Sequence, residues 1–282
     1  MKKPLLQDHD LIAELEADAG SKQLRLWWLG QSGFLISWEP WRLLVDPYLS
    51  DSLTQKYATT DKPHVRVTER VIDPRLFREI SFVTASHAHT DHLDAETLRG
   101  IRRSNDPTFI APRAIRGVAE ERWGPDSNPI VFMSDGESQI WGDVRIQAVP
   151  AAHNSLDRDA DGNAMYLGYL VKLGPFTVYH SGDTKLYPGM ADLLRPFNID
   201  VALLPINGDR PERRVAGNLS GKEAAQLAKD IGAKLVIPCH YDMFEFNTAD
   251  PADQFVPECE RLDQRYRVLQ QGERWSSDEL AT

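Results

Sequence analysis

The order of short apolar segments and amphipathic segments constrains the fold of this chain more than any other feature. Strand-like apolar stretches dominate residues 24–45, and strand and helix patterns then alternate over residues 73–133. A second run of strands covers residues 144–180, after which helix and strand patterns alternate again as far as residue 264. A mixed order of this kind favours a layered α/β sandwich over a doubly wound parallel sheet.

These patterns predict individual elements and one long loop. The expected strands are 24–29, 34–38, 42–45, 81–85, 108–111, 130–133, 144–149, 166–173, 177–180, 201–204 and 234–238. The expected helices are 5–19, 73–80, 94–103, 113–123, 188–195, 221–231 and 253–264. Residues 47–72 are polar and weakly patterned, which predicts a long loop. We expect one domain over 1–282, with an N-terminal helical extension of about residues 1–23.

Composition limits the partners of the chain. Its 282 residues carry 42 acidic against 32 basic side chains, a net charge of −10, which argues against a nucleic-acid partner. No apolar run is long enough for a membrane span, so no membrane association is expected. The first residues lack the apolar stretch of a signal peptide, and the two cysteines fit a reducing compartment. The expected location is therefore the cytoplasm.

Three of the eight histidines lie within residues 86–92, which read Ser-His-Ala-His-Thr-Asp-His. This segment follows a predicted buried strand and precedes a predicted helix, the position at which α/β folds place their ligands. Imidazole and carboxylate groups without a thiolate suit Zn²⁺, Mn²⁺ or Fe²⁺. A polar loop with scattered histidines is the alternative, and so dense a cluster in a histidine-poor chain disfavours it.

The pattern His-x-His-x-Asp-His at 87–92 resembles the signature of the metallo-β-lactamase fold hydrolases. Three later segments match the remaining anchors of that superfamily, and each lies just past a predicted strand. They are 149–153 (Val-Pro-Ala-Ala-His), 179–184 (Tyr-His-Ser-Gly-Asp-Thr) and 236–240 (Val-Ile-Pro-Cys-His). The resemblance implies a four-layer αβ/βα sandwich and a metal-dependent hydrolase.

It also implies a site for two divalent metal ions, Zn or Mn, with Fe as a further option. The implied ligands are His87, His89 and His153 for one ion and Asp91, His92 and His240 for the other, with Asp183 bridging both. Such ions lower the pKa of a bound water and make hydroxide available at neutral pH. Asp91 would also orient this nucleophile and accept its proton, which makes it the implied catalytic residue.

Taken alone, several of these residues have simpler interpretations. His153 and His240 would then be hydrogen-bonded buried histidines, and Asp183 a turn former. The order of the motifs favours the ligand interpretation. Asp46 resembles the superfamily's carboxylate that orients a ligand histidine, with a capping role as a nearly equal alternative. The role of His180 stays open because it matches no ligand of the superfamily.

Four segments indicate a branch of the superfamily. They are residues 26–33 (Leu-Trp-Trp-Leu-Gly-Gln-Ser-Gly), 179–183, 199–203 and 233–242, which resemble the UlaG-like ascorbate-6-phosphate lactonases. This resemblance implies a small ester, lactone or phosphorylated sugar as the substrate. The Pro-Ala-Ala-His sequence at 150–153 is instead similar to the phosphodiesterase branch that cleaves N-acyl phosphatidylethanolamine. A phosphodiesterase and a non-catalytic metal-binding module are therefore the alternatives.

A small anionic substrate would need a local counter-charge or hydrogen-bond donors. The candidates for substrate binding are Arg210, Arg213, Asn218 and Tyr241, most of them on the loop before the helix expected at 221–231. A solvated charged loop is an equally good interpretation of the arginines. Because the resembled relatives assemble, a homo-oligomer is one state open to this chain.

Overall fold

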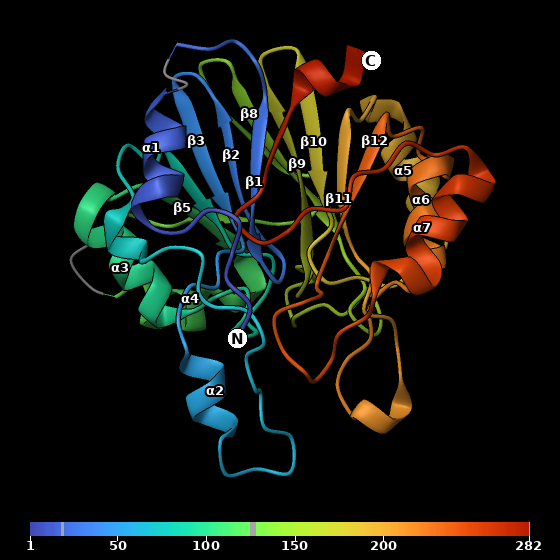
Figure 1. Cartoon of the computed structure of the whole chain (residues 1–282), viewed down its shortest axis with the longest axis horizontal. Helices are drawn as coiled ribbons and strands as arrows, with labels where there is room; N and C mark the ends of the chain where they lie inside the picture. The colour runs from blue at the N-terminus through green and yellow to red at the C-terminus, as the bar shows by residue number, and fades with distance from the viewer. Residues whose placement is uncertain (18–19, 125–127, 282) are drawn as a thin grey trace. The chain divides into compact units, whose positions relative to one another are not determined.

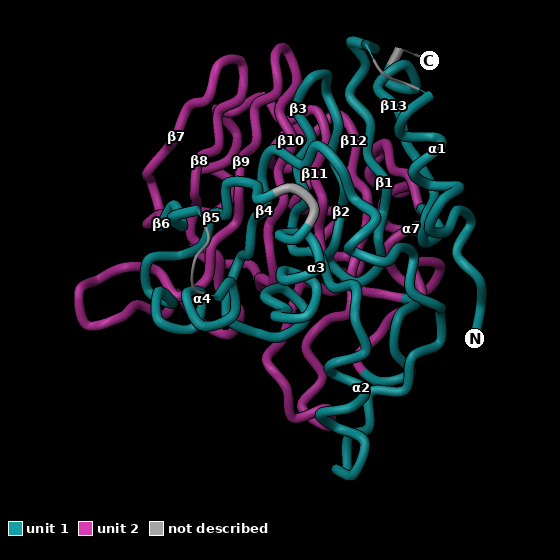
Figure 2. The backbone as a smooth tube through the Cα atoms, turned by 90° about the vertical axis from the view of Figure 1, so that its left-hand side faces the viewer, with its two compact units in different colours: residues 1–132, 242–246, 269–282 teal, residues 133–241, 247–268 magenta. Residues whose placement is uncertain are grey.

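The computed structural model describes residues 1–17, 20–124 and 128–281, which divide into two compact units. Unit 1 comprises residues 1–132, 242–246 and 269–282, and unit 2 comprises residues 133–241 and 247–268 (Figure 2). The chain contains two mixed β-sheets with helices beside each of them (Figure 1). The single-domain organisation over 1–282 stays a prediction.

Unit 1 is built on a seven-stranded sheet. Its strands are β1 (Arg25–Gly30), β2 (Gly33–Trp38), β3 (Trp41–Val45), β4 (Phe82–Thr84), β5 (Thr108–Pro112), β6 (Val131–Met133) and β13 (Arg274–Ser276). Their order across the sheet is β13-β1-β2-β3-β4-β5-β6. The neighbours β1, β2 and β3 are antiparallel, whereas β3, β4 and β5 run parallel. The helices are α1 (His9–Ala17), α2 (Ser52–Tyr57), α3 (Ala95–Asn105) and α4 (Arg116–Trp123).

Unit 2 is built on a six-stranded sheet. Its strands are β7 (Ser138–Trp141), β8 (Val144–Pro150), β9 (Leu167–Leu173), β10 (Phe176–His180), β11 (Val201–Pro205) and β12 (Leu235–Cys239). They lie in the order β12-β11-β10-β9-β8-β7. The first three strands of this order run parallel, and β9 is antiparallel to both β8 and β10. The helices are α5 (Met190–Leu194), α6 (Gly221–Asp230) and α7 (Pro251–Leu262).

The core of unit 1 explains its near-continuous apolar strands. Every residue of β1 and β2 is buried, so these strands lack the alternation of a sheet with one wet face. Trp27 and Trp28 have no exposed surface, in keeping with a core position for this pair. The Trp27 indole donates to Glu14 on α1 (Nε1 to Oε2, 2.8 Å), and Leu11 and Leu15 of α1 are buried. The N-terminal helix is thereby docked within unit 1.

Most predicted elements are confirmed, but four predictions are wrong. The loop 47–72 contains the helix α2, and β7 and β13 have no counterpart in the prediction. The helix expected at 73–80 is a single 3₁₀ turn, Pro74–Leu76, whose N-cap Asp73 accepts a hydrogen bond from the Arg75 amide. The turn ends because Phe77 is extended and Glu79 has a positive φ of 57°. β13 is only three residues long and takes its stability from pairing with β1, which local sequence does not encode.

The helix expected at 5–19 begins later than predicted. It starts at His9, after Asp8 adopts a positive φ of 46°. Residues 18 and 19 of the predicted helix lie outside the described residues. Within the described part of the chain, none of the helices is both long enough and apolar enough to span a membrane.

Within each sheet, the loops that carry the predicted site residues lie at one edge of that sheet. In unit 1, Val45 of β3 pairs with Thr84 of β4, so the residues that follow these parallel strands are neighbours. In unit 2, β8, β10, β11 and β12 share one direction, because β9 reverses the chain between β8 and β10. The loops after these four strands therefore meet at the same edge of their sheet. Such an edge is the usual ligand-binding edge of α/β sheets.

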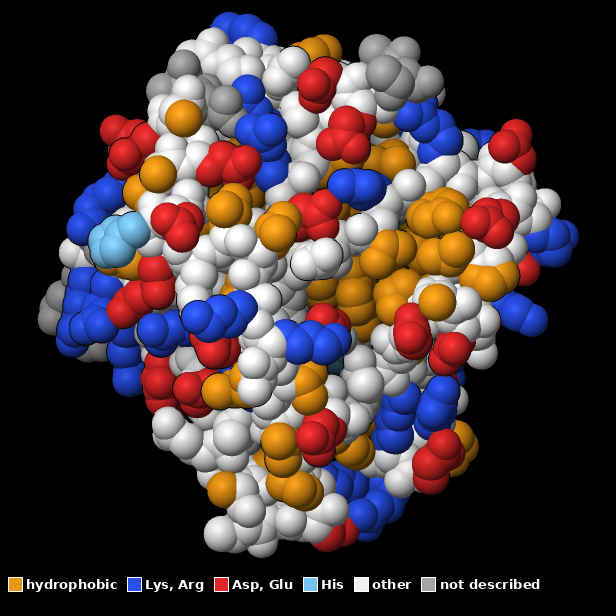
Figure 3. Space-filling view, in the orientation of Figure 1, with side chains coloured by type: hydrophobic (Ala, Val, Ile, Leu, Met, Phe, Trp, Pro, Cys, Tyr) orange, Lys and Arg blue, Asp and Glu red, His pale blue; other side chains and the backbone are white. Residues whose placement is uncertain are grey.

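Charged side chains are mixed on the surface. On the face shown in Figure 3, basic side chains are interspersed with acidic ones rather than gathered in a stripe. This agrees with the acidic overall balance of the sequence. The absence of a nucleic-acid partner remains a prediction.

The helix α3 begins immediately after the histidine segment, and its N-cap Asp94 holds three pieces of unit 1 together. Its carboxylate accepts hydrogen bonds from the Thr97 amide (2.9 Å), the Thr97 hydroxyl and the Ser52 hydroxyl (2.8 Å). The Thr97 hydroxyl oxygen also accepts from the Leu49 amide (2.8 Å). Asp94 is 1% exposed and Thr97 is fully buried, so the two Thr97 donors have no alternative partner in bulk water.

We expect Asp94→Ala to lower the free energy of unfolding by about 2–3 kcal/mol, because it removes an N-cap and leaves buried donors unpaired. Urea unfolding followed by circular dichroism measures this change. The control variant is Asp161→Ala, at an exposed position of unit 2, and it should shift stability by less than about 0.5 kcal/mol. Equal losses in the two variants would contradict the structural role of Asp94.

Candidate metal centre

A buried carboxylate after β3 organises the histidine segment of unit 1. Asp46 has no exposed surface and a positive φ of 43°, which turns its side chain toward the loop after β4. Its Oδ1 accepts from the Ser86 amide (2.8 Å), and its Oδ2 accepts from the Ser86 hydroxyl. His92 Nδ1 lies 2.7 Å from Asp46 Oδ2. Because an ionised carboxylate only accepts, Nδ1 of His92 carries the proton and Nε2 carries the lone pair.

The same carboxylate sets the tautomer of a second histidine. Ser86 Oγ lies 3.0 Å from His87 Nδ1. The only proton of this hydroxyl is donated to Asp46, so toward His87 the hydroxyl oxygen is an acceptor. His87 Nδ1 therefore carries a proton, and its Nε2 presents a lone pair. Metal-ligating histidines usually have one ring nitrogen held in this way.

Hydrogen bonds within the turn over residues 89–93 and from Arg122 of α4 hold this turn in place. The amides of His92 and Leu93 donate to the His89 carbonyl (3.1 and 2.9 Å), which starts the turn into α3. The Arg122 guanidinium donates to the carbonyls of Ala88 (2.7 Å) and Leu93 (2.8 Å). Burial lowers the pKa of Arg122, yet an arginine stays charged at neutral pH and its two hydrogen bonds here are charge-assisted.

Asp91 is held in this loop by a residue of the β1–β2 turn. Gln31 Nε2 donates to Asp91 Oδ2 over 2.9 Å. Asp91 Oδ2 lies 3.7 Å from His92 Nε2, and the Asp91 side chain is 18% exposed, whereas that of His92 is fully buried. The Asp91 carboxylate is therefore partly exposed to solvent, while the hydrogen bond from Gln31 sets its orientation.

In unit 2, His153 is fixed by the loop before α6. Its Nδ1 lies 3.0 Å from the Gly217 carbonyl oxygen, which only accepts, so Nδ1 is protonated here too. The Ala152 amide donates to the Thr184 hydroxyl (3.0 Å), and the Lys185 amide donates to the Ala152 carbonyl (2.7 Å). These bonds tie the segment of His153 to the segment that carries Asp183.

Asp183 lies between two histidines of unit 2. Its Oδ2 is 3.7 Å from His153 Nε2 and 3.4 Å from His240 Nε2. Positive φ angles at Gly182 (60°) and His240 (63°) make the sharp turns after β10 and β12. The Gly182 amide donates to His180 Nδ1 (3.2 Å), so His180 braces the turn before Asp183.

These spacings test whether the residues fit a metal ion. The three nitrogen–oxygen separations of 3.4, 3.7 and 3.7 Å exceed the usual length of an N–H···O hydrogen bond. Two ligand atoms about 2.1 Å from one ion at a tetrahedral angle lie roughly 3.4 Å apart. The donor set and its spacing therefore fit a first-row divalent cation.

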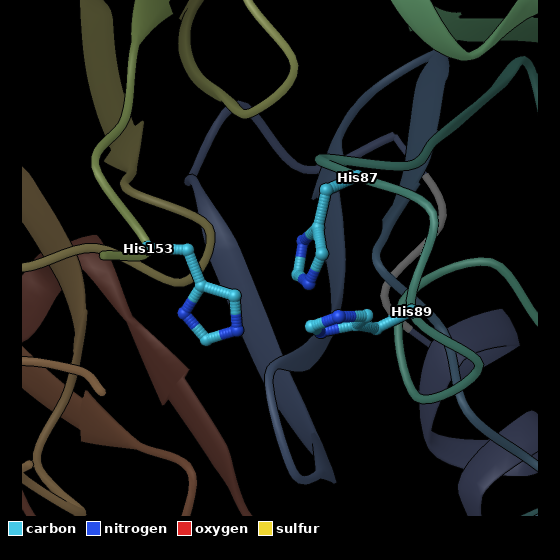
Figure 4. A group of neighbouring side chains, drawn as sticks. All are labelled: His87, His89 and His153. Atoms are coloured by element: carbon cyan, nitrogen blue, oxygen red, sulfur yellow. The ribbon is translucent and has the colours of Figure 1, made fainter. Parts of the chain in front are cut away.

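Among the residues that the structure describes, three groups of side chains have ligand atoms that lie within 4.8 Å of one another and could hold a metal ion. The groups are His87, His89 and His153; His87, His92 and Asp183; and Asp91, His92 and His240. Figure 4 shows the first of them, in which the three imidazole rings point toward one another. All seven residues that the sequence predicts as ligands occur in these groups.

The four predicted substrate-binding residues differ in their surroundings. Arg213 donates to the carbonyls of Asn207 and Thr248 (2.6 Å each) and to Asn247 Oδ1 (3.0 Å), so its guanidinium braces the loop. Asn218 donates to Asn207 Oδ1 (3.0 Å), while its own buried Oδ1 has no partner within the described residues. Arg210 is exposed and Tyr241 is buried. Substrate contact by any of the four stays a prediction.

Sequence reasoning missed three residues near these groups. Gln31 and Arg122 contact the loop that carries the histidine segment from distant positions in the chain, and no local sequence pattern assigned either residue to the site. His64 packs on Tyr57 and on Phe244, with ring centroids 4.4 and 5.3 Å away. Burial lowers the pKa of His64, an effect partly offset by its hydrogen bond to the Lys62 carbonyl and by the charge of Asp91.

Comparison with solved structures identifies the fold. The chain superimposes on YhfI of Bacillus subtilis, a metallo-β-lactamase fold protein, with a TM-score of 0.63 at 16% identity, covering 91% of this chain and 100% of that one. This likeness, together with the two mixed sheets flanked by helices, confirms the predicted fold class.

Sequence comparison then gives the family. Residues 41–241 match the Beta-lactamase superfamily domain. A UPF0173 metal-dependent hydrolase of Pyrococcus furiosus is 30% identical over 235 residues, which cover 82% of this chain and 90% of that protein. The probable L-ascorbate-6-phosphate lactonase UlaG of Escherichia coli is 27% identical over 258 residues, covering 81% and 72%. The chain therefore belongs to the metallo-β-lactamase superfamily and is a metal-dependent hydrolase.

We expect Asp46→Asn to weaken the binding of a divalent metal ion by about 10- to 100-fold, because it removes the acceptor that fixes the tautomers of His87 and His92. Competition with a chromogenic chelator measures this affinity. Asp161→Asn, on the surface of unit 2, supplies the control for loss of one negative charge. Metal affinity that falls equally in both variants would show that Asp46 acts through net charge alone.

Proposed function

We propose that this metal-dependent hydrolase binds two divalent ions through His87, His89, Asp91, His92, His153, Asp183 and His240 and cleaves a small anionic ester or lactone. The observation that supports this most directly is the set of three groups whose ligand atoms lie within 4.8 Å of one another. Histidine and carboxylate donors suit Zn, Mn and Fe alike, and the proposal does not choose among them.

Divalent ions bound here would supply the reaction with hydroxide at neutral pH by lowering the pKa of water. The chain's own residues would orient the metal ligands and supply acid–base catalysis. Asp46 and Gly217 hold the imidazoles of His92 and His153 so that each presents Nε2. Asp91 is the acid–base residue of the proposal, because its carboxylate reaches solvent and is oriented by Gln31.

The metal requirement can be tested directly. We expect chelation to abolish hydrolysis of lactones or p-nitrophenyl esters, and the variants His87→Ala and Asp183→Ala to lower kcat/KM by at least about 1,000-fold, since each removes an implied ligand. Elemental analysis of the purified protein gives the bound metal. Arg145→Ala, on the exposed side of β8, is the control and should keep full activity. Unchanged activity in both ligand variants would refute the proposed centre.

An anionic substrate is supported by the contrast between two arginines on one loop. The donors of Arg213 are engaged with three protein oxygens. The guanidinium of Arg210 has no hydrogen bond or ion pair within the described residues, and it is exposed. The relative UlaG is named for a phosphorylated lactone. We therefore assign anion recognition to Arg210 and loop bracing to Arg213.

Accordingly, Arg210→Ala should raise KM for a phosphorylated lactone by about 10-fold with little change in kcat, because it removes one charge-assisted contact of about 1.5 kcal/mol. Steady-state kinetics with a neutral lactone provide the matched control, and its KM should stay constant. An equal rise for both substrates would argue against anion recognition by Arg210.

The same assays separate the alternatives. A phosphodiesterase of the kind that cleaves N-acyl phosphatidylethanolamine would hydrolyse bis-p-nitrophenyl phosphate faster than any lactone. A binding module would take up metal and leave every substrate of the panel intact. Preference for the lactones and esters is the outcome that the proposal requires.

A further inference from the structure

We propose that Gln31 is a positioning residue, which orients Asp91 so that one face of its carboxylate is presented to the metal centre. The inference rests on the proposed function, because it assumes that Asp91 is a metal ligand. Its starting observation is the hydrogen bond from Gln31 Nε2 to Asp91 Oδ2, 2.9 Å long and joining residues 60 positions apart.

The backbone at Gln31 is in a conformation that glutamine rarely adopts. Gln31 has a φ of +51°, and it lies in the two-residue loop between β1 and β2. Loops of this kind favour glycine or asparagine, because a longer side chain in the left-handed region is strained. Gln31 is nevertheless only 5% exposed, so its side chain is turned inward despite the strain. Strain retained at a buried polar residue points to a function of its side chain.

The turn that carries Gln31 is held rigidly. The Trp28 indole donates to the Gln31 carbonyl over 3.0 Å. Gly30 has a φ of +94°, which favours glycine, and a Cβ there would lie 2.5 Å from Met243 Cε and 2.7 Å from Gln271 Oε1. A Cβ at Gly33 would approach the Asp46 carbonyl to 3.2 Å. Close packing on both sides of the turn therefore restricts the motion of the Gln31 side chain and its amide group, as a positioning role requires.

The chemistry of the amide suits this role. A carboxylate rotates readily about its last bond, and two oxygens could compete for one cation. The donor of Gln31 occupies Oδ2 on one side and so fixes the plane of the Asp91 carboxylate. Asp91 then offers its remaining lone pairs in a constant direction. A neutral donor orients the carboxylate without cancelling the charge that attracts a cation, which a lysine or arginine would do.

A double-mutant cycle on metal affinity tests the inference with a readout other than activity. Gln31→Leu keeps the bulk of the side chain and removes its amide group, both the NH2 donor and the carbonyl acceptor. We expect it to weaken Zn²⁺ binding at the weaker site by about 10- to 100-fold, measured by chelator competition. In the Asp91→Ala background the same substitution should change affinity less than about twofold, because Gln31 would have nothing left to orient.

The catalytic readout should show the same dependence. Gln31→Leu is expected to lower kcat on the best substrate of the panel by about 10-fold or more and to change KM less than twofold, since a misoriented ligand affects the reaction more than substrate binding. Gln270→Leu, at an exposed position on the chain segment after α7, is the matched control and should leave both metal affinity and kcat unchanged.

The outcomes distinguish this inference from the function on which it rests. Wild-type protein that takes up no metal would overturn both. Metal binding and hydrolysis by the wild type, combined with additive effects of Gln31→Leu and Asp91→Ala, would overturn the positioning role alone. If Gln31→Leu fails to fold in thermal denaturation, Gln31→Asn replaces it, because asparagine tolerates the positive φ but is one methylene too short to reach Asp91. Wild-type affinity in Gln31→Asn would likewise overturn the inference.

Discussion

The buried carboxylate of Asp46 is the interaction on which the candidate centre of unit 1 depends. Burying a charge without partners is strongly unfavourable, and here the partners are the amide and hydroxyl of Ser86 and the ring of His92. Because the hydroxyl proton is committed to Asp46, His87 must donate to the hydroxyl oxygen. One charge thereby sets the proton positions of two imidazoles and places both lone pairs on Nε2.

Sharp turns at the ends of parallel strands bring the side chains to one edge of each sheet. Asp46, Gly182 and His240 follow β3, β10 and β12, and all three have positive φ angles. A non-glycine residue in this region is strained, so the surrounding hydrogen bonds must hold it there. For Asp46 these are the hydrogen bonds with Ser86 and His92, which also define the tautomers of His87 and His92. The strain and the chemistry of the site thus depend on the same contacts.

The sequence predicted the strands best where they are buried and apolar, as in β1 and β2. The cluster at 87–92 stood out because its histidines are closely spaced and follow a strand, whereas His153, Asp183 and His240 were expected as ligands only from the resemblance to the metallo-β-lactamase fold hydrolases. The sequence did not predict contacts between residues that lie far apart in the chain. Gln31 and Asp91 are 60 positions apart, and Arg122 and Ala88, whose carbonyl it contacts, are 34 positions apart. No local pattern encodes such contacts. The short strand β13 was missed for the same reason, since its partner strand β1 lies near the other end of the chain.

The loop before α6 shows why substrate contacts are harder to infer than metal ligands. Arg210 and Arg213 have the same charge and nearly the same sequence context, yet one is exposed and the other is half-buried with its donors engaged. Burial lowers the pKa of Arg213, and its three protein acceptors offset the partial desolvation of its charge. An arginine in that state stabilises the loop and has few donors left for a ligand. In the proposed function, recognition of an anion is therefore assigned to Arg210, the side chain that the fold leaves in water.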